Sequence, residues 1–238
     1  MPSNVFRGMI DRHLPWDGCY NARDLGGLPA GDRLTRRGAV VRSDAPDRLS
    51  AEGWAAVRAH GVRTILDLRN PSERGPEPAG FTVLHVPIDD EDDVEMWTEI
   101  WESGINGTPL YFRPVLERKA HLLAEAVTAV AEAEPGGVLV HCAAGRDRTG
   151  LVSMLLLALV GVAPEDIADD YELSTARLAP GFAALGMPDQ GPYIEMALAA
   201  KGVTAREAVL SVLADHDVEE LLDLPGPTLA ALRERLLG

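Results

Sequence analysis

The residues best suited to chemistry in this 238-residue chain lie in the segment VLVHCAAGRDRTG, residues 138–150. Cys142 follows an apolar run typical of a strand, and a helix is expected to begin near Thr149. Three small residues lie between them, Ala143, Ala144 and Gly145, and their backbone amides can approach an anion closely. The N-terminus of the helix adds partial positive charge at the same place. This spacing predicts a loop that binds a phosphate group.

The same segment supplies a candidate nucleophile. Arg148 lies six residues after Cys142, and its guanidinium can donate two hydrogen bonds to one phosphate. Cationic and helix-terminal surroundings stabilise a thiolate, so Cys142 is predicted to attack phosphorus at neutral pH. His141 can orient the loop or the thiolate, and the Thr149 hydroxyl can bond the sulfur when it leaves again. The alternative is an inert buried cysteine beside a surface arginine.

The segment resembles the Cys-x5-Arg-Ser/Thr phosphate loop of protein tyrosine phosphatases. Its fuller form is similar to the bacterial atypical branch, which includes enzymes active on phosphotyrosine, phosphoserine or phosphothreonine, and phosphoinositides. Residues 21–27, 41–44, 66–69 with Glu73, and 170–174 match that family's other blocks, so the resemblance covers most of residues 15–178. Arg146 stands where the family often has lysine, which keeps the charge but replaces a point charge with a planar fork.

The resemblance implies a cysteine-dependent phosphomonoester hydrolase with a phosphocysteine intermediate. It implies a tyrosine phosphatase first, with dual or phosphoinositide specificity left open, and it implies no cofactor. The loop residues from Ala143 to Asp147 would bind the substrate phosphate. The sequence contains no ligand spacing that suggests a metal.

The general acid is expected after a strand that ends at Pro87, where the sequence reads DDEDD from residue 89. Alignment with the family favours Asp90, with Asp89 close behind. Asp147, inside the phosphate loop, is a rival for this role. A solvated acidic loop is the alternative interpretation.

Polar residues beside the apolar runs are expected to support the phosphate loop. We expect most of them to form a buried ion-pair network, and one or two of them to line the pocket instead: Arg23, Asp24, Arg42, Asp67 and Arg69. Residues 94–112 hold Trp97, Trp101, Tyr111 and Phe112, which suit either an aromatic lid over the site or an ordinary helix on the sheet.

Apolar runs and helical periods alternate along the chain. Strands are expected at 39–42, 62–68, 81–86 and 138–141, and helices at 51–60, 115–133 and 149–160. This order predicts an α/β fold with a central, mostly parallel sheet flanked by helices. After Pro180 the residue pattern changes. A capping box at Thr204 and Glu207 then predicts the start of a helix. We therefore expect a catalytic core over 1–180 and a helical extension over 181–238 packed on it.

The charge balance limits the partners. Twenty-two basic and 37 acidic residues give a net charge of −15, which argues against nucleic acids and against stable association with anionic membranes. A phosphorylated protein or a small phosphoester is the expected substrate. With two cysteines and no signal-peptide pattern at the start, a cytoplasmic location is expected, although leaderless secretion stays open.

Two other functions remain open on the sequence. A rhodanese-type sulfurtransferase also uses a cysteine at a strand end cradled by amides, although the seven-residue span from Cys142 to Arg148 favours a phosphatase. The second of these is a non-catalytic phosphate-binding module, but such modules usually lose the cysteine or the arginine.

Overall fold

The computed structural model describes residues 11–238, and a five-stranded sheet forms the centre of that part. Its strands are β1 (Arg23–Asp24), β4 (Val40–Ser43), β5 (Val62–Asp67), β6 (Thr82–His85) and β7 (Gly137–His141). They lie in the order β1-β4-β7-β5-β6, and β4, β7, β5 and β6 are parallel to one another. Only the edge strand β1 is antiparallel to its neighbour. A separate ribbon pairs β2 (Pro29–Ala30) with β3 (Arg33–Leu34).

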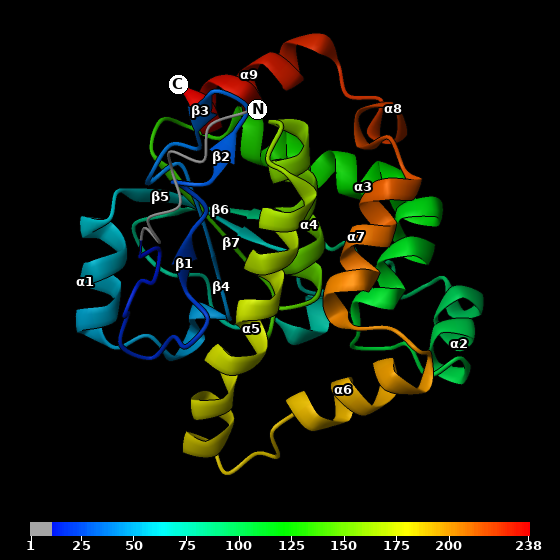
Figure 1. The fold of residues 1–238 in the computed structure, drawn as a ribbon. Helices are drawn as coiled ribbons and strands as arrows, with labels where there is room; N and C mark the ends of the chain where they lie inside the picture. The colour runs from blue at the N-terminus through cyan, green and yellow to red at the C-terminus, as the bar shows by residue number, and fades with distance from the viewer. Residues whose placement is uncertain (1–10) are drawn as a thin grey trace.

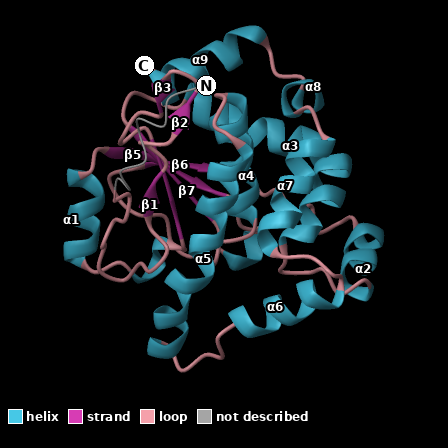
Figure 2. Cartoon of the chain, in the orientation of Figure 1, coloured by secondary structure: helices cyan, strands magenta, loops and turns pink. Residues whose placement is uncertain are grey.

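Helices surround this sheet (Figure 1; Figure 2). They are α1 (Ala51–Ala59), α2 (Val94–Glu102), α3 (Phe112–Glu132), α4 (Arg148–Leu159), α5 (Pro164–Ala184), α6 (Gly191–Ala200), α7 (Ala205–Asp215), α8 (Val218–Leu222) and α9 (Gly226–Leu237). The expected α/β fold with a central, mostly parallel sheet is confirmed.

Alternate residues of the central strand β7 face two separate cores, because successive strand side chains point to opposite faces. Val138 and Val140 pack in the larger core, which also takes residues from α3 and α4. Leu139 packs in the smaller core with Val57 of α1 and Trp16. Ten of the twelve residues of α4 are buried, as its nearly all-round apolar sequence predicts. The loop predicted to bind phosphate therefore lies between two central elements, β7 and α4.

The structure places no boundary between elements at residue 180, where the sequence predicted one. Helix α5 continues through Pro180 to Ala184, and the Leu185 amide bonds the Gly181 carbonyl at 3.1 Å. The change in residue pattern at Pro180 therefore does not mark a break between elements. Beyond α5, the expected capping box of Thr204 and Glu207 starts α7, which packs on α5, while α9 packs on α3.

Candidate active site

The loop from Cys142 to Asp147 joins the end of β7 to the start of α4. Cys142 is buried, with 3% of its surface exposed. Gly145 has a φ of 66°, and a Cβ atom there would lie 2.1 Å from the Ser43 carbonyl oxygen. Only glycine fits this turn, because any side chain would collide with the backbone of the neighbouring strand β4.

Hydrogen bonds to the carbonyl groups of Ala144 and Gly145 hold the loop in place. Asn21 Nδ2 donates to the carbonyls of Ala144 at 3.1 Å and Gly145 at 3.0 Å, and Arg42 donates to the Gly145 carbonyl at 2.9 Å. Within residues 11–238, the backbone N–H groups from Ala143 to Asp147 donate no hydrogen bond to the protein. These amides and the N-terminus of α4 together form a site suited to an anion.

Arg148 lies in the same pocket as Cys142. Its guanidinium is bonded at both ends by the carboxylate of Glu73, at 2.5 and 2.7 Å, and lies 3.2 Å from Asp89 Oδ2. The bonds from Arg148 hold the pKa of Glu73 below its usual value. Glu73 is itself fixed by a capping box with Asn70. The arginine is thus fixed over the loop by a bidentate ion pair.

Two adjacent carboxyl groups of the acidic segment have different surroundings. Asp89 lines the pocket together with Cys142 and Arg148, and only 13% of its side chain is exposed. Burial raises the pKa of Asp89 to about 6, against the opposing charge of Arg148. Within residues 11–238, its carboxyl group accepts a hydrogen bond from Asn70 Nδ2 alone, at 3.4 Å. A carboxyl group with this pKa can hold a proton at near-neutral pH.

Asp90, which alignment favours as the acid, is directed elsewhere. Its backbone has a φ of 50°, and its Oδ2 atom lies 2.6 Å from Lys119 Nζ on α3. It does not line the pocket of Cys142. The structure therefore brings Asp89, and not Asp90, together with the cysteine and the arginine.

His141 and Thr149 flank Cys142 in the chain. His141 Nδ1 lies 3.0 Å from the Cys142 carbonyl oxygen, and burial lowers the pKa of its ring. His141 therefore contacts the backbone of the loop. The Thr149 hydroxyl is fully buried at the first turn of α4 and has no partner within the described residues. A buried hydroxyl without a partner costs about 1–3 kcal/mol, which suits a group reserved for a ligand or a neighbouring sulfur.

Arg146 and Asp147 are bonded to each other at one side of the loop. Arg146 donates to Asp147 Oδ2 at 3.0 Å and to Gln190 Oε1 at 3.1 Å, and it is 4% exposed. Asp147 Oδ1 also accepts a hydrogen bond from Tyr171 at 3.3 Å. Both residues line the pocket, so they shape its wall while their charges are largely paired.

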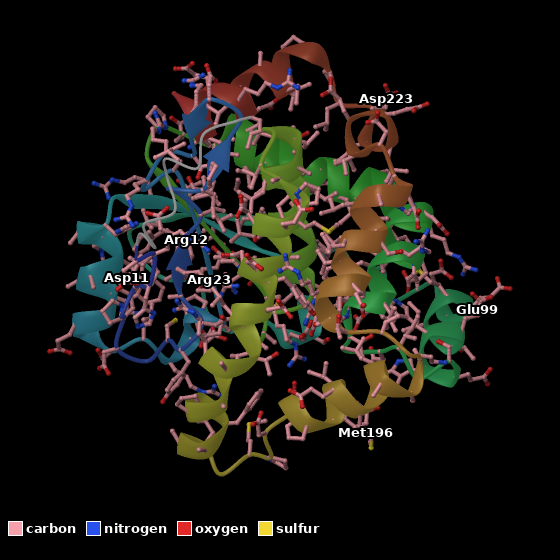
Figure 3. The ribbon with its side chains drawn as sticks, viewed as in Figure 1. Asp11, Arg12, Arg23, Glu99, Met196 and Asp223 are labelled. Atoms are coloured by element: carbon pink, nitrogen blue, oxygen red, sulfur yellow. The ribbon has the colours of Figure 1, made fainter. Side chains whose placement is uncertain are left out.

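The arginines expected to support the loop meet in one buried network. Asp170 on α5 is 2.8 Å from Arg42, 3.1 Å from Arg23 and 2.7 Å from Arg12. Burial opposes the charge of Asp170, but the three guanidinium groups outweigh it and hold its pKa well below the usual range. Figure 3 shows Arg12 and Arg23 close together beside α5. Arg42 connects this network directly to the Gly145 carbonyl.

Asp24, Asp67 and Arg69 lie away from that network. Asp24 accepts hydrogen bonds from the amides of Gly26 and Gly38, so it shapes the turn after β1. Asp67 and Arg69 pair with each other at 2.9 Å at the end of β5. Of these supporting residues, Arg42 alone is bonded to the phosphate loop.

The pocket has a volume of about 720 Å³, and its far wall is helix α2. Trp97 and Trp101 of α2 line it, together with Tyr111. Trp97 Nε1 donates to the Asp89 carbonyl at 2.9 Å, so α2 is attached to the acidic segment. Both expectations for this region therefore apply in part: α2 packs on the core through Met96 and Ile100, and it also walls the pocket.

Sequence reasoning missed Asn70 and Gln190 of the pocket, and Lys119, which lies outside the pocket but holds Asp90. Lys119 lies in the apolar stripe of α3 between Leu116 and Leu123, and a lysine at a buried position of an amphipathic helix was the available signal. Gln190 comes from the loop before α6, for which the sequence holds no comparable signal.

Within 11–238, no group of three or more His, Cys, Asp or Glu side chains is placed to hold a metal ion. No helix in the same range is long and apolar enough to cross a bilayer.

Comparisons with known proteins agree with this geometry. A candidate tyrosine-protein phosphatase of Cupriavidus necator is 35% identical over 178 residues, which cover 71% of this chain and 65% of that protein. The triple specificity protein phosphatase PtpB of Mycobacterium tuberculosis is 31% identical over 196 residues, which cover 68% of each chain. This chain thus spans about two thirds of the length of these relatives.

The solved structure of a P. aeruginosa TpbA variant in complex with phosphotyrosine aligns with 77% of this chain and 83% of that one. Its TM-score of 0.38 and identity of 19% are too low to transfer residue roles. A family model described as the tyrosine phosphatase family matches residues 14–219, most of the chain and all of the pocket. The chain therefore belongs to the tyrosine phosphatase family.

Proposed function

We propose that this protein is a cysteine-dependent phosphomonoester hydrolase that acts on phosphotyrosine in proteins through a phosphocysteine intermediate. The observation that carries this proposal is the shared pocket of Cys142, Arg148 and Asp89. A nucleophile, a phosphate-binding fork and a carboxyl group with a pKa of about 6 face one cavity. These are the groups that a metal-independent transfer of a phosphoryl group to sulfur requires.

In the first step, the thiolate of Cys142 attacks phosphorus and the bond from phosphorus to the ester oxygen breaks. The loop amides and Arg148 hold the three non-bridging oxygens as charge builds on them. Glu73 keeps the guanidinium in place for this contact. The protonated Asp89 gives its proton to the departing oxygen, which leaves as an alcohol or a phenol.

In the second step, water attacks the phosphocysteine and Asp89, now ionised, accepts a proton from that water. The bond from sulfur to phosphorus breaks, inorganic phosphate leaves, and Cys142 returns as a thiolate. The buried Thr149 hydroxyl donates a hydrogen bond to the sulfur as its charge returns. We assign Asp90 no step, because its carboxylate is paired with Lys119.

The range of substrates is part of this proposal. One relative is named a triple specificity phosphatase, so phosphoserine, phosphothreonine and phosphoinositides belong in the same assay as phosphotyrosine. Arg146 keeps a positive charge at the pocket wall, but Asp147 and Gln190 already bind it. We therefore place phosphotyrosine first.

We also propose a cytoplasmic protein without nucleic-acid or stable membrane partners. The net charge of −15 repels both kinds of polyanionic surface. Two free, buried cysteines and a catalytic thiolate suit a reducing compartment. The catalytic core would extend to the end of α5 at residue 184 rather than to 180, and the helices from α6 to α9 would form the extension packed on it.

Release of inorganic phosphate from p-nitrophenyl phosphate, without added metal, tests the function. Wild type is expected to turn over, and Cys142→Ser is expected to lose at least about a thousandfold in kcat, because serine is a far weaker nucleophile than a thiolate. Turnover that survives in Cys142→Ser would refute the assigned nucleophile. Persulfide formation from thiosulfate, or phosphopeptide binding without turnover, would favour a sulfurtransferase or a binding module instead.

A further inference from the structure

The catalytic pocket extends well beyond the phosphate loop. Its volume of about 720 Å³ is in the range of cavities that enclose drug-sized ligands. Cys142 and Arg148 line it together with side chains of α2. The pocket therefore has room for parts of a substrate next to the phosphorylated group.

The α2 wall exposes large apolar side chains. Val94 is 69% exposed and Trp101 is 65% exposed, and both line the pocket. Neither is needed to hold the helix in place, since Met96 and Ile100 on its buried face already do so. Exposed apolar side chains that gather at a pocket mark a binding surface, and tryptophan is often the strongest contributor to such surfaces.

Two unpaired carboxylates accompany these apolar residues. Glu91 and Glu102 line the same wall, and neither has a hydrogen bond or an ion pair within residues 11–238. Glu99 of the same helix differs, because it pairs with Arg118 at 2.7 Å. Figure 3 shows Glu99 on the outward side of α2. Asp89 and Asp147 also line the pocket, but they pair with Arg148 and Arg146. Within residues 11–238, Glu91 and Glu102 are therefore the pocket carboxylates left free to bind a cation.

We propose that this α2 wall recognises phosphoprotein segments that carry a basic residue and a large apolar residue close to the phosphorylated one. The proposal rests on the phosphatase function proposed above. The basic residue pairs with Glu91 and Glu102, and the apolar one packs on Trp101 and Val94. A phosphorylated lipid in an anionic bilayer fits less well, because its neighbours would face these carboxylates and a molecule of net charge −15.

Two phosphotyrosyl peptides, identical except for Arg or Glu at the positions flanking the phosphotyrosine, test this specificity. Wild type is expected to favour the Arg peptide in kcat/KM by about 3- to 10-fold, and less at high salt. The double variant Glu91→Gln/Glu102→Gln is expected to lose most of that preference. Glu99→Gln removes one carboxylate of α2 that does not line the pocket, so it is expected to keep the preference.

A second variant tests the apolar half. Trp101→Ala is expected to raise KM for both peptides about tenfold relative to p-nitrophenyl phosphate, with its thermal unfolding midpoint measured alongside. Equal kcat/KM for the two peptides with wild type, or a full preference in the double variant, would overturn the proposal. So would a Trp101→Ala defect confined to a phosphoinositide presented in vesicles.

Failure of the specificity and failure of the chemistry give different results. Binding of the same two peptides to Cys142→Ser reports the preference without any turnover. A preference in binding with no hydrolysis by wild type would refute the phosphatase and retain the recognition surface. Hydrolysis of both peptides without a preference would support the phosphatase and refute the recognition surface.

Discussion

Two neighbouring aspartates show how surroundings decide the chemistry of a single residue. Asp89 is largely buried, and this burial raises its pKa to about 6 although the charge of the neighbouring Arg148 lowers it. Its neutral form is the proton donor, so kcat is expected to fall as the pH rises above about 6. Asp89→Asn is expected to lower kcat about a hundredfold on phenyl phosphate and to remove that fall. Rates measured from pH 4.5 to 8 would show both effects.

The neighbouring position provides the control. Asp90→Asn removes a carboxylate of the same size one residue away, but outside the pocket. It is expected to lose less than about tenfold in kcat and to keep the decline above pH 6. A decline that disappears in Asp90→Asn and persists in Asp89→Asn would reverse the assignment.

The sequence predicted an aspartate acid at Asp90 or Asp89 and ranked Asp90 first, whereas the pocket favours Asp89. The loop motif was sufficient for Cys142 and Arg148, because their spacing fixes how a strand, a turn and a helix bring them together. The choice between Asp89 and Asp90 depends on a backbone reversal at φ 50° and on Lys119, a residue 29 positions away. Neither follows from local pattern, because both are consequences of tertiary packing.

At the scale of elements, Lys119 connects α3 to the acidic segment and to α2. Its ammonium lies 2.6 Å from Asp90 Oδ2 and 2.6 Å from Asp93 Oδ2. Asp93 caps α2 by accepting a hydrogen bond from the Met96 amide. The helix α3 is kinked at Lys119, where φ is −123°. One buried cation thus positions the general-acid segment and the helix that walls the pocket.

Lys119→Met is therefore expected to weaken acid catalysis without touching the reacting atoms. Poor leaving groups depend most on proton donation, so kcat should fall about tenfold on phenyl phosphate and less on p-nitrophenyl phosphate. Lys119→Arg is expected to restore part of the rate by keeping the charge. A displaced acid would lower kcat more on phenyl phosphate than on p-nitrophenyl phosphate. A general loss of folded protein would lower both rates equally.

Lys201, the other lysine of the chain, is exposed and provides a matched control. Lys201→Met is expected to leave both rates unchanged. Equal losses on the two substrates in Lys119→Met would argue against a role in positioning Asp89.

Most elements were predictable. β7 is a short apolar run that begins after the turn at Pro135 and Gly136, and β5 is rich in β-branched and apolar residues and begins after Gly61. Helix α5 was harder, because Pro180 reads as a helix breaker. It is tolerated near the end of α5, where Phe182 is still buried, and Gly181 lies against the ring of Tyr20. Packing contacts of this kind outweigh a local signal, and no sequence pattern reveals them.

At the scale of the whole molecule, the C-terminal helices complete the core far from the pocket. In Figure 1, α9 lies at the opposite end of the molecule from α2 and α6. Leu232 and Leu236 of α9 are fully buried in the larger core, together with residues of α3 and α4. The Arg36 amide also bonds the Leu236 carbonyl at 2.6 Å, which links the end of the chain to its beginning.

This arrangement predicts one cooperative unit rather than a core with an independent appendage. Leu232→Ala is expected to lower the free energy of unfolding by about 2–5 kcal/mol, because it leaves a cavity in the shared core. Urea denaturation is expected to stay a single transition, with kcat/KM of the folded protein unchanged. Glu234→Ala, on the exposed side of α9, should cost less than about 0.5 kcal/mol. Two separate transitions, of which only one moves in Leu232→Ala, would instead mean that residues 181–238 fold on their own and that the catalytic core does not depend on them.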